Sequence, residues 1–260
     1  MQARKIVSTI EARMTSTRLP GKVMKPILGK PVLELLVERL KSVELINEIV
    51  IATTVNRDDD VIEELGRKIG VKVFRGSEND VLGRVLAAAQ GINADLIVEI
   101  TGDCPFIDPA VARECIKLFL SGDYDYVSNG CRLRTFPDGL AVQVFPVKVL
   151  EEVNSLTSDA IYREHTSYYI YTHPEKYKLK NYPAQGELCW PELAISLDTP
   201  QDYELIKIIF EELYPKNPLF SAFDIVRFLR SRPELLKIND DPQRRRKYIE
   251  SIPRSLKNER

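Results

Sequence analysis

The amino-acid sequence predicts an α/β fold: a doubly wound, mostly parallel sheet with a small antiparallel extension and C-terminal helices. The first observation is that strand-like and helix-like segments alternate through residues 1–122, which favours right-handed crossovers between parallel strands. The second is that the strand-like runs are continuously apolar, as in Ile49, Val50 and Ile51. Such runs are typical of strands that are covered on both faces.

The first half of the chain contains predicted strands at residues 5–10, 48–53, 71–74 and 95–100. Predicted helices lie between them at residues 31–42, 58–69 and 80–90. Pro31 suits the first turn of its helix. The apolar residues of each helix recur at helical spacing, and we expect these stripes to face the sheet. The stripes are Leu33, Leu36, Val37 and Leu40; Val61, Ile62, Leu65 and Ile69; and Val81, Leu82, Val85 and Leu86.

The second half of the chain is less regular. Strands are expected at residues 124–128, 132–136, 141–145, 177–182 and 192–197, with a turn at residues 137–139. An aromatic-rich helix is expected at residues 159–171. A further helix at residues 200–213 begins after Thr199, whose hydroxyl is a suitable N-cap before Pro200. We expect the remaining residues to be helical and charged.

Length and composition favour one compact domain over residues 1–260. Thirty-seven basic and 38 acidic residues give a net charge of −1, so no global positive field attracts nucleic acid or an anionic membrane. Four cysteines without a CxxC pair and only two histidines argue against a zinc site and favour free thiols in the cytoplasm. No apolar stretch reaches the length of about 18 residues that a membrane-spanning helix needs.

The loop after the first predicted strand concentrates positive charge. Arg13, Arg18 and Lys22 lie in it beside Ser16 and Thr17. Cations, hydroxyls and turn amides at the carboxyl end of a strand suit a polyphosphate ligand, because ligands of open α/β sheets bind at that edge. The alternative is a solvated basic loop without a ligand.

Two carboxylates follow other predicted strands. Asp103 comes after the fourth strand, and Asp198 ends the run from Leu193 to Leu197. Mg²⁺ prefers one or two protein carboxylates together with phosphate oxygens and water, so a metal between these residues and the basic loop is expected. Asp198 has an alternative role as a cap of the helix at Pro200.

The sequence contains neither a GxGxxG motif after the first strand nor a GxxxxGK[ST] motif, which argues against dehydrogenases and P-loop enzymes. Instead, three ordered motifs resemble those of sugar-activating cytidylyltransferases, the 3-deoxy-manno-octulosonate and acylneuraminate cytidylyltransferases. They are residues 12–22 with Gly29-Lys30-Pro31, residues 100–105 and residues 196–202. Residues 74–82, 136–140 and 163–166 resemble the branch named for spore-coat polysaccharide biosynthesis.

This resemblance implies a Rossmann-like nucleotidyltransferase fold and transfer of CMP from CTP to a sugar acid or sugar phosphate, with release of pyrophosphate, for polysaccharide or glycan biosynthesis. It further implies a nucleotide-binding half, 1–122, a sugar-binding and dimerisation half, 123–260, and a cytoplasmic homodimer. The implied catalytic residues are Arg13, Lys22, Asp103 and Asp198, and the last two would bind Mg²⁺. The implied nucleotide contacts are Ala12, Arg13, Ser16, Thr17, Arg18, Lys22, Thr53, Thr54, Arg75, Gly76, Ser77 and Asp80. The implied sugar contacts are Asp138, Gly139, Arg163 and His165.

Some of these residues have a purely structural alternative. Asp80 can accept from a cytosine amino group, but it is equally placed to cap the helix that follows it. Asp138 and Gly139 suit a turn. His165 lies on an apolar, aromatic segment, which favours a partly buried position for its ring.

The sequence also departs from the family pattern. Glu11 stands where relatives usually carry Gln or Pro, Thr15 where the branch usually has Gly, and Glu99 where a basic residue is common. Glu11 and Glu99 make the local field near the triphosphate less positive.

Two other functions compete with nucleotidyl transfer. A metal-dependent glycosyltransferase would use a DxD motif, and Asp123-Tyr124-Asp125 has that spacing, although it precedes a strand and suits a surface turn. A nucleic-acid-binding protein would need the basic run at residues 244–247. Acidic residues flank that run, which favours a solvated helix face.

Overall fold

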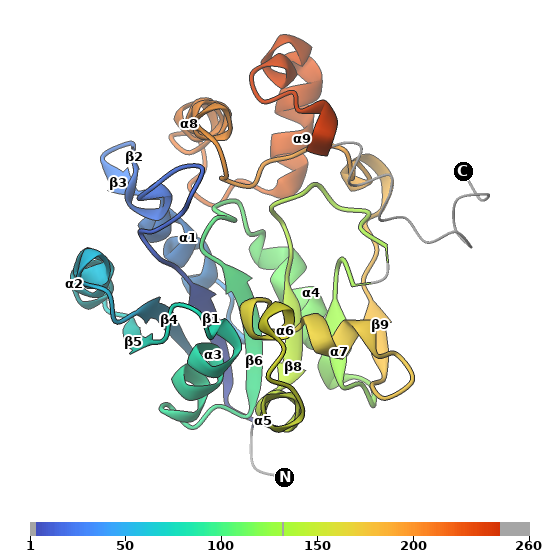
Figure 1. Ribbon diagram of the computed structural model, residues 1–260. Helices are drawn as coiled ribbons and strands as arrows, with labels where there is room; N and C mark the ends of the chain where they lie inside the picture. The colour runs from blue at the N-terminus through green and yellow to red at the C-terminus, as the bar shows by residue number, and fades with distance from the viewer. Residues whose placement is uncertain (1–3, 132, 245–260) are drawn as a thin grey trace.

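The structure, a computed structural model, describes residues 4–131 and 133–244 (Figure 1). Its centre is a seven-stranded sheet with the order β5-β4-β1-β6-β8-β7-β9. These strands are β1 (Ile6–Glu11), β4 (Glu48–Thr54), β5 (Lys72–Gly76), β6 (Leu96–Thr101), β7 (Tyr126–Ser128), β8 (Gln143–Pro146) and β9 (Leu179–Asn181). A separate antiparallel pair joins β2 (Pro26–Ile27) to β3 (Lys30–Pro31). The predicted fold class is confirmed.

The parallel part of the sheet places the site. Strand β1 pairs in parallel with β4 on one side and with β6 on the other, and β5 extends the sheet in parallel beyond β4. The loops that follow these strands therefore gather at one edge of the sheet. Beyond β6, strand β8 runs in the opposite direction, because it is antiparallel to both β6 and β7, whereas β9 pairs in parallel with β7.

Helices cover both faces of the sheet (Figure 1). The α-helices are α1 (Val32–Lys41), α2 (Asp60–Lys68), α3 (Val81–Gln90), α4 (Pro109–Leu120), α5 (Val147–Leu156), α6 (Ala160–Glu164), α7 (Tyr168–Thr172), α8 (Pro200–Leu213) and α9 (Ala222–Ser231). The 3-10 helices are η1 (Lys22–Met24), η2 (Arg57–Asp59), η3 (Gly186–Leu188) and η4 (Pro233–Lys237). One buried apolar cluster joins α3 and α5 to the sheet, and another joins α1, α4, α8 and α9.

The apolar stripes of the first half are buried largely as predicted. Leu33, Leu36, Val37 and Leu40 of α1 are all within the core. Val61 is the exception, because it lies at the start of α2 and is 40% exposed, whereas Ile62 and Leu65 turn inward.

The second half departs more from the prediction. Two helices, α4 and α5, were not predicted, although Asp108 caps α4 directly before Pro109 and accepts from the Ala110 amide at 2.7 Å. The strand expected at residues 132–136 is wrong for residues 133–136, and residue 132 lies outside the described residues. The strand expected at 192–197 is also wrong, since only Ala194 forms a bridge, to Asp138.

The helix expected at residues 159–171 is broken into α6 and α7. Between them lies a bend at residues 165–167, which we call the elbow. The hydroxyls of Thr166 and Ser167 donate to Glu11 and Gln143. Serine and threonine hydroxyls that bond elsewhere compete with helix continuation, which explains the break.

The C-terminal segment closes over α8. Arg244 donates to both carboxylate oxygens of the fully buried Asp202 at 2.9 Å, so the expectation of a solvated face is wrong for this residue. Residues 245–247 lie outside the described residues. Within 4–131 and 133–244, the structure shows no helix of the length and apolar character required to cross a bilayer.

Candidate active site

The basic loop after β1 has a defined shape. Gly21 adopts a φ of +68°, and its amide donates to the Met14 carbonyl at 2.8 Å, which closes the loop into a turn. The Met14 amide donates in turn to the buried Asp59 at 2.7 Å. These bonds fix the loop above the carboxyl ends of β1 and β4.

Two carboxylates meet this loop, as the sequence predicts. The Lys22 ammonium lies 2.7 Å from Asp103 Oδ2 and 3.0 Å from Asp198 Oδ1, so it bridges the two residues. Burial lowers the pKa of Lys22, but Asp103 and Asp198 outweigh burial and raise that pKa above its ordinary value. Arg18 also contacts Asp198, at 3.0 Å. Residues 176 positions apart in sequence thus form one charged cluster.

The backbone holds the two carboxylates together. The Leu197 amide donates to the Asp103 carbonyl at 2.8 Å, which places Asp198 beside the end of β6. Asp198 is not the cap of α8, because the Thr199 hydroxyl accepts from the Asp202 amide in a capping box. The alternative structural role predicted for Asp198 therefore belongs to its neighbour.

Asp138 and Gly139 support this arrangement from the second half of the chain. The Asp138 amide donates to Leu193 and its carbonyl accepts from Ile195, both at 2.8 Å. A Cβ on Gly139 would lie 2.6 Å from the Ser196 nitrogen, and the φ of Gly139 is +105°. Glycine is thus required by a close approach of two backbones, as the turn interpretation indicates.

A cavity of about 250 Å³ lies at this site. Its lining includes the predicted nucleotide contacts Ala12, Arg13, Ser16 and Lys22, together with Asp103 and His165. The structural alternative for His165, a partly buried position, is wrong, because the residue is exposed at the elbow. Thr17 is exposed and is absent from the lining.

The residues predicted around the base are mostly engaged with other protein groups. The Thr54 hydroxyl donates to Asp59, and Thr53 is buried. Arg75 donates to the Thr54 and Asn56 carbonyls and to Asp60 and Glu63 of the α2 region, so its guanidinium is held by that segment.

Asp80 has the structural role that was the alternative to a base contact, the cap of α3. Its carboxylate caps α3 through the Gly83 amide at 2.9 Å and also accepts from Arg163. Burial raises the pKa of Asp80, but the Arg163 bond and the cap outweigh burial and hold the pKa below its ordinary value. The Ser77 carbonyl accepts from Arg84, a nearly buried residue that sequence reasoning missed.

Glu11 and Glu99 form the second feature that sequence reasoning did not foresee. Glu11 lines the cavity, Glu99 is buried on the neighbouring strand β6, and their carboxyl groups are within hydrogen-bonding reach of one another. Burial raises the pKa of Glu11 and raises that of Glu99 well above its ordinary value. They were identified in the sequence only as departures from the family pattern.

A second cavity of about 210 Å³ opens at the end of β7 and the start of β8. Asp138 and Gly139 line it. Its other lining residues include Tyr126, Asn129 and Gln143, which the sequence did not single out. Arg134 enters the lining and pairs with Asp138 at 2.9 Å.

A metal ion would have a limited set of protein ligands here. Across residues 4–131 and 133–244, no group of three or more His, Cys, Asp and Glu side chains is arranged to hold a metal. Asp103 and Asp198 supply two carboxylates around a shared cation position. Two carboxylates with substrate phosphates and water match the ligands that Mg²⁺ prefers. The donor set therefore fits a metal that arrives with a phosphate ligand.

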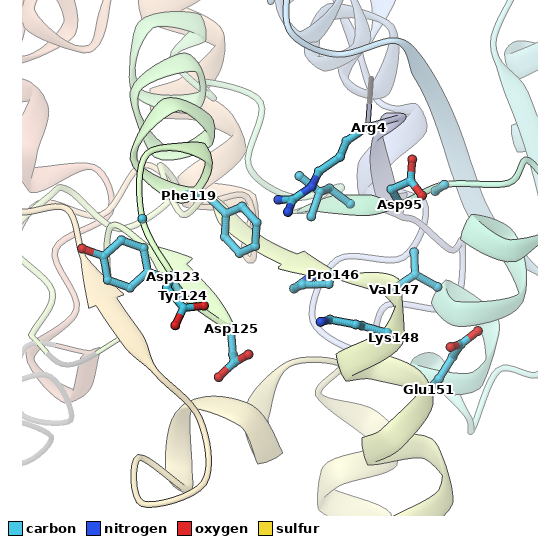
Figure 2. A pocket seen from close by; sticks show the side chains of 13 residues that line it. Arg4, Asp95, Phe119, Asp123, Tyr124, Asp125, Pro146, Val147, Lys148 and Glu151 are labelled. Carbon is cyan, nitrogen blue, oxygen red and sulfur yellow. The ribbon is translucent and has the colours of Figure 1, made fainter. Parts of the chain in front are cut away.

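The DxD motif lies elsewhere. Figure 2 shows Asp123, Tyr124 and Asp125 around a cavity of about 480 Å³ with Arg4 and Lys148. This cavity is at the start of β6, the sheet edge opposite to Asp103. The predicted surface position of Asp123 is confirmed by its side-chain exposure of 92%. A glycosyltransferase site built on this motif would be separated from the basic loop.

Comparisons with known proteins agree with this geometry. The Cytidylyltransferase family model matches residues 7–222. The chain is 32% identical over 236 residues to the spore coat polysaccharide biosynthesis protein SpsF of Bacillus subtilis, covering 88% of this chain and 95% of that protein. It is 35% identical over 161 residues to a 3-deoxy-manno-octulosonate cytidylyltransferase of Geobacter metallireducens, covering 61% and 60%.

A solved structure shows the same architecture. A cytidylyltransferase from Leptospira borgpetersenii matches with a TM-score of 0.86 and 34% identity, over 92% of this chain and 99% of that one. The family match extends over the basic loop, both carboxylates and the turn that supports them. The chain therefore belongs to the cytidylyltransferase family and is a nucleotidyltransferase.

Proposed function

We propose that the protein transfers CMP from CTP to a sugar acid and releases pyrophosphate. The observation that carries this proposal is the cluster in which Lys22 bridges Asp103 and Asp198 below the basic loop. Relatives named for spore coat polysaccharide biosynthesis and for 3-deoxy-manno-octulosonate support a sugar product destined for a cell-surface glycan.

The proposed chemistry is displacement at the α-phosphorus of CTP. An acceptor oxygen forms a bond to that phosphorus, and the bond to the pyrophosphate oxygen breaks. Negative charge therefore increases on the leaving group, where cations stabilise it most. Arg13, Arg18 and Lys22 would hold the triphosphate, and Asp103 and Asp198 would hold Mg²⁺. The metal would neutralise phosphate charge and orient the reacting groups.

Lys22 would change partners when the substrate binds. Without nucleotide, its ammonium neutralises both carboxylates. A phosphate oxygen of the nucleotide would compete with these carboxylates for the ammonium, whose charge would then stabilise the triphosphate. We propose this exchange as the way in which Lys22 contributes to binding of the triphosphate.

The base would be bound at the ends of β4 and β5, by Thr53, Thr54, Arg75, Gly76 and Ser77. Because Arg75 and Asp80 are already paired, backbone groups near Gly76 and Ser77 are the better candidates for reading a pyrimidine. Asp80 would act mainly through its cap of α3 and its bond to Arg163.

The acceptor would occupy the second cavity, next to the nucleotide. Asp138 and Gly139 line that cavity, and His165 lines the first. Arg163 of α6 donates hydrogen bonds to Asp80 and Asn154. We propose a sugar acid rather than a sugar 1-phosphate, because Glu11 beneath the site penalises a dianion more than a carboxylate.

The whole chain would act as one domain and as a homodimer in the cytoplasm, without nucleic-acid or membrane partners. The second half, residues 123–260, would supply the dimer contact. Light scattering of the purified protein tests this proposal, and a mass of one chain at working concentration would contradict it.

The experiment that tests the reaction is a matrix of the four nucleoside triphosphates against octulosonates, nonulosonates and sugar 1-phosphates. Pyrophosphate release is measured with Mg²⁺, with Mn²⁺ and with chelator. We expect saturable release with CTP and a sugar acid, and none with chelator. Release only with a sugar 1-phosphate would contradict the acceptor class. Consumption of a nucleotide-sugar without pyrophosphate release would favour a glycosyltransferase.

A further inference from the structure

Two acids lie at the nucleotide cavity, on one face of the sheet: Glu99 is buried, whereas Glu11 is half-buried and lines the cavity. Strands β1 and β6 pair so that Thr9 is opposite Glu99 and Glu11 is opposite Thr101. Because alternate residues of a strand share a face, Glu11 and Glu99 point to the same side. Glu99 is 3% exposed, and its Oε2 atom has no hydrogen-bond partner among the described residues.

The two acids cannot both be ionised while they hydrogen bond to one another. An ionised carboxylate only accepts hydrogen bonds, so a bond between two carboxyl groups requires a proton on one of them. Two adjacent buried negative charges would also repel strongly. The pair Glu11–Glu99 therefore keeps one proton in this arrangement.

This pair is bonded to the elbow. The Thr166 hydroxyl donates to Glu11 Oε1 at 2.8 Å, and Ser167 contacts Glu99. Thr166 and Ser167 are 2% and 3% exposed, although the helices that flank them are only five residues long. Helices this short are not stable alone, so these buried bonds determine where the elbow lies.

The same bonds continue to the second cavity. Ser167 and Tyr126 both donate to Gln143 Oε1, and both Tyr126 and Gln143 line that cavity. Glu11 lines the first cavity, as does His165, which directly precedes Thr166. A continuous set of hydrogen bonds thus joins the nucleotide cavity to the acceptor cavity through the elbow.

We propose that Glu11 and Glu99 are positioning residues that share one proton and hold the elbow against the sheet, so that His165 and Gln143 are correctly placed for the acceptor. The use of an acceptor rests on the proposed function, whereas the attachment of the elbow does not. Neither acid needs to touch a substrate for this role.

The charged and titratable groups around the pair determine how it responds to pH. They are Arg84 from α3, Asp103 after β6, Tyr126 from β7 and Tyr171 from α7. Arg84 favours ionisation of Glu11, and Asp103 opposes it, but burial is the larger influence. A carboxyl group whose pKa is raised by folding binds its proton more tightly in the folded protein than in the unfolded chain. The attachment is therefore complete at low pH and weakens as pH rises through the raised pKa.

Hydrogen–deuterium exchange over residues 163–172 tests the attachment without any substrate. In the wild type, we expect elbow protection, corrected for the intrinsic exchange rate, to fall as pH rises above the ordinary range of a glutamate side chain, because burial raises the pKa of both acids. Glu99→Gln keeps a donor to Glu11 but cannot ionise, so its protection should stay constant with pH. Glu64→Gln, at an exposed position on α2, should behave as the wild type. Equal pH responses in the wild type and Glu99→Gln would overturn the proposal.

Thr166→Val tests the link to the acceptor. This variant removes one hydroxyl bond while it preserves side-chain shape, and we expect about a fivefold rise in the acceptor KM, the factor that corresponds to one net hydrogen bond. The KM for CTP should change far less. Thr172→Val, which alters an exposed hydroxyl at the end of α7, should leave both constants unchanged. Unchanged elbow exchange and unchanged acceptor KM in Thr166→Val would overturn the proposal. Absence of transfer with every acceptor would instead contradict the proposed function, and the exchange data would still decide the attachment.

Discussion

The two halves of the sheet place their functional groups in different ways. In the parallel half, each loop follows its own strand, so β1 carries the basic loop and β6 carries Asp103. In the other half, Asp138, Gly139 and Asp198 are placed by contacts between distant segments, such as the bond from Ile195 to Asp138. The first kind of placement follows from topology alone, whereas the second depends on packing of irregular backbone.

This difference implies that substitutions in the two halves should have different effects on activity and on stability. Where topology positions a side chain, its removal should impair chemistry and leave stability intact. Where packing positions the backbone, a substitution of a residue that supports that backbone, such as Gly139, should lower the free energy of unfolding first and transfer second. The following predictions test that distinction, beginning with the largest expected effect.

Asp103→Asn and Asp198→Asn should each lower the rate of nucleotidyl transfer by a factor on the order of a thousand. This factor corresponds to the loss of several kcal/mol of transition-state stabilisation. Each substitution removes a carboxylate from the position now bridged by Lys22. Pyrophosphate release under saturating CTP is the measurement. Asp123→Asn, at the opposite sheet edge, is the matched control and should retain full activity. Turnover near that of the wild type in either active-site variant would contradict the assignment.

Lys22→Ala should weaken CTP binding more than Arg18→Ala. The Lys22 side chain is 11% exposed and contacts two carboxylates, whereas Arg18 is 62% exposed and contacts one. An exposed ion pair contributes at most about 1 kcal/mol, and we expect the Lys22 substitution to exceed that value. The CTP-induced rise in melting temperature reports both effects. The same rise in the wild type and both variants would show that the loop does not hold the triphosphate.

The contrast between the halves also explains how much could be predicted from the sequence. The first four long strands and three helices carry local signals, such as the apolar run at Ile49–Ile51 and the stripe of α1, and each was predicted within a few residues. Arg13, Lys22 and Asp103 could be placed for the same reason, because strand order alone brings their loops to one edge.

The remaining features depend on contacts that no local pattern reveals. Residues 192–197 alternate as a strand would, yet their backbone bonds to Asp138 and Asp103 instead of a sheet neighbour. The elbow interrupts a predicted helix because Thr166 finds a partner 155 positions away, at Glu11. Glu11 and Glu99 are departures from the family pattern in the sequence, and no local pattern indicates that strands β1 and β6 place them on one face of the sheet.

Gly139→Ala should destabilise the protein by about 2 kcal/mol, since it combines an unfavourable positive φ with a backbone clash. A Cβ at this position would lie 2.6 Å from the Ser196 nitrogen, so residues 195–198 must shift and carry Asp198 with them. Transfer should fall together with the melting temperature. Gly130→Ala is the control for stability, because nothing lies within 4 Å of the Cβ it adds. Equal stability of the two variants would contradict the conclusion that packing against Gly139 positions the backbone that carries Asp198.

Thr199→Ala should have the smallest effect on activity of these substitutions. It distinguishes a loss of stability from a loss of transfer most clearly. Thr199 caps α8 through the Asp202 amide at 3.2 Å, and loss of such a cap costs about 1 kcal/mol of stability. Its neighbour Asp198 makes no cap bond from its side chain, so Asp198→Asn should lose transfer without losing stability. Ser221→Ala removes the equivalent capping box of α9, far from the charged cluster, and should lower the melting temperature equally. If Thr199→Ala lost transfer as completely as Asp198→Asn, the cap and the carboxylate would be one functional unit, and the separate roles given to these adjacent residues would be wrong.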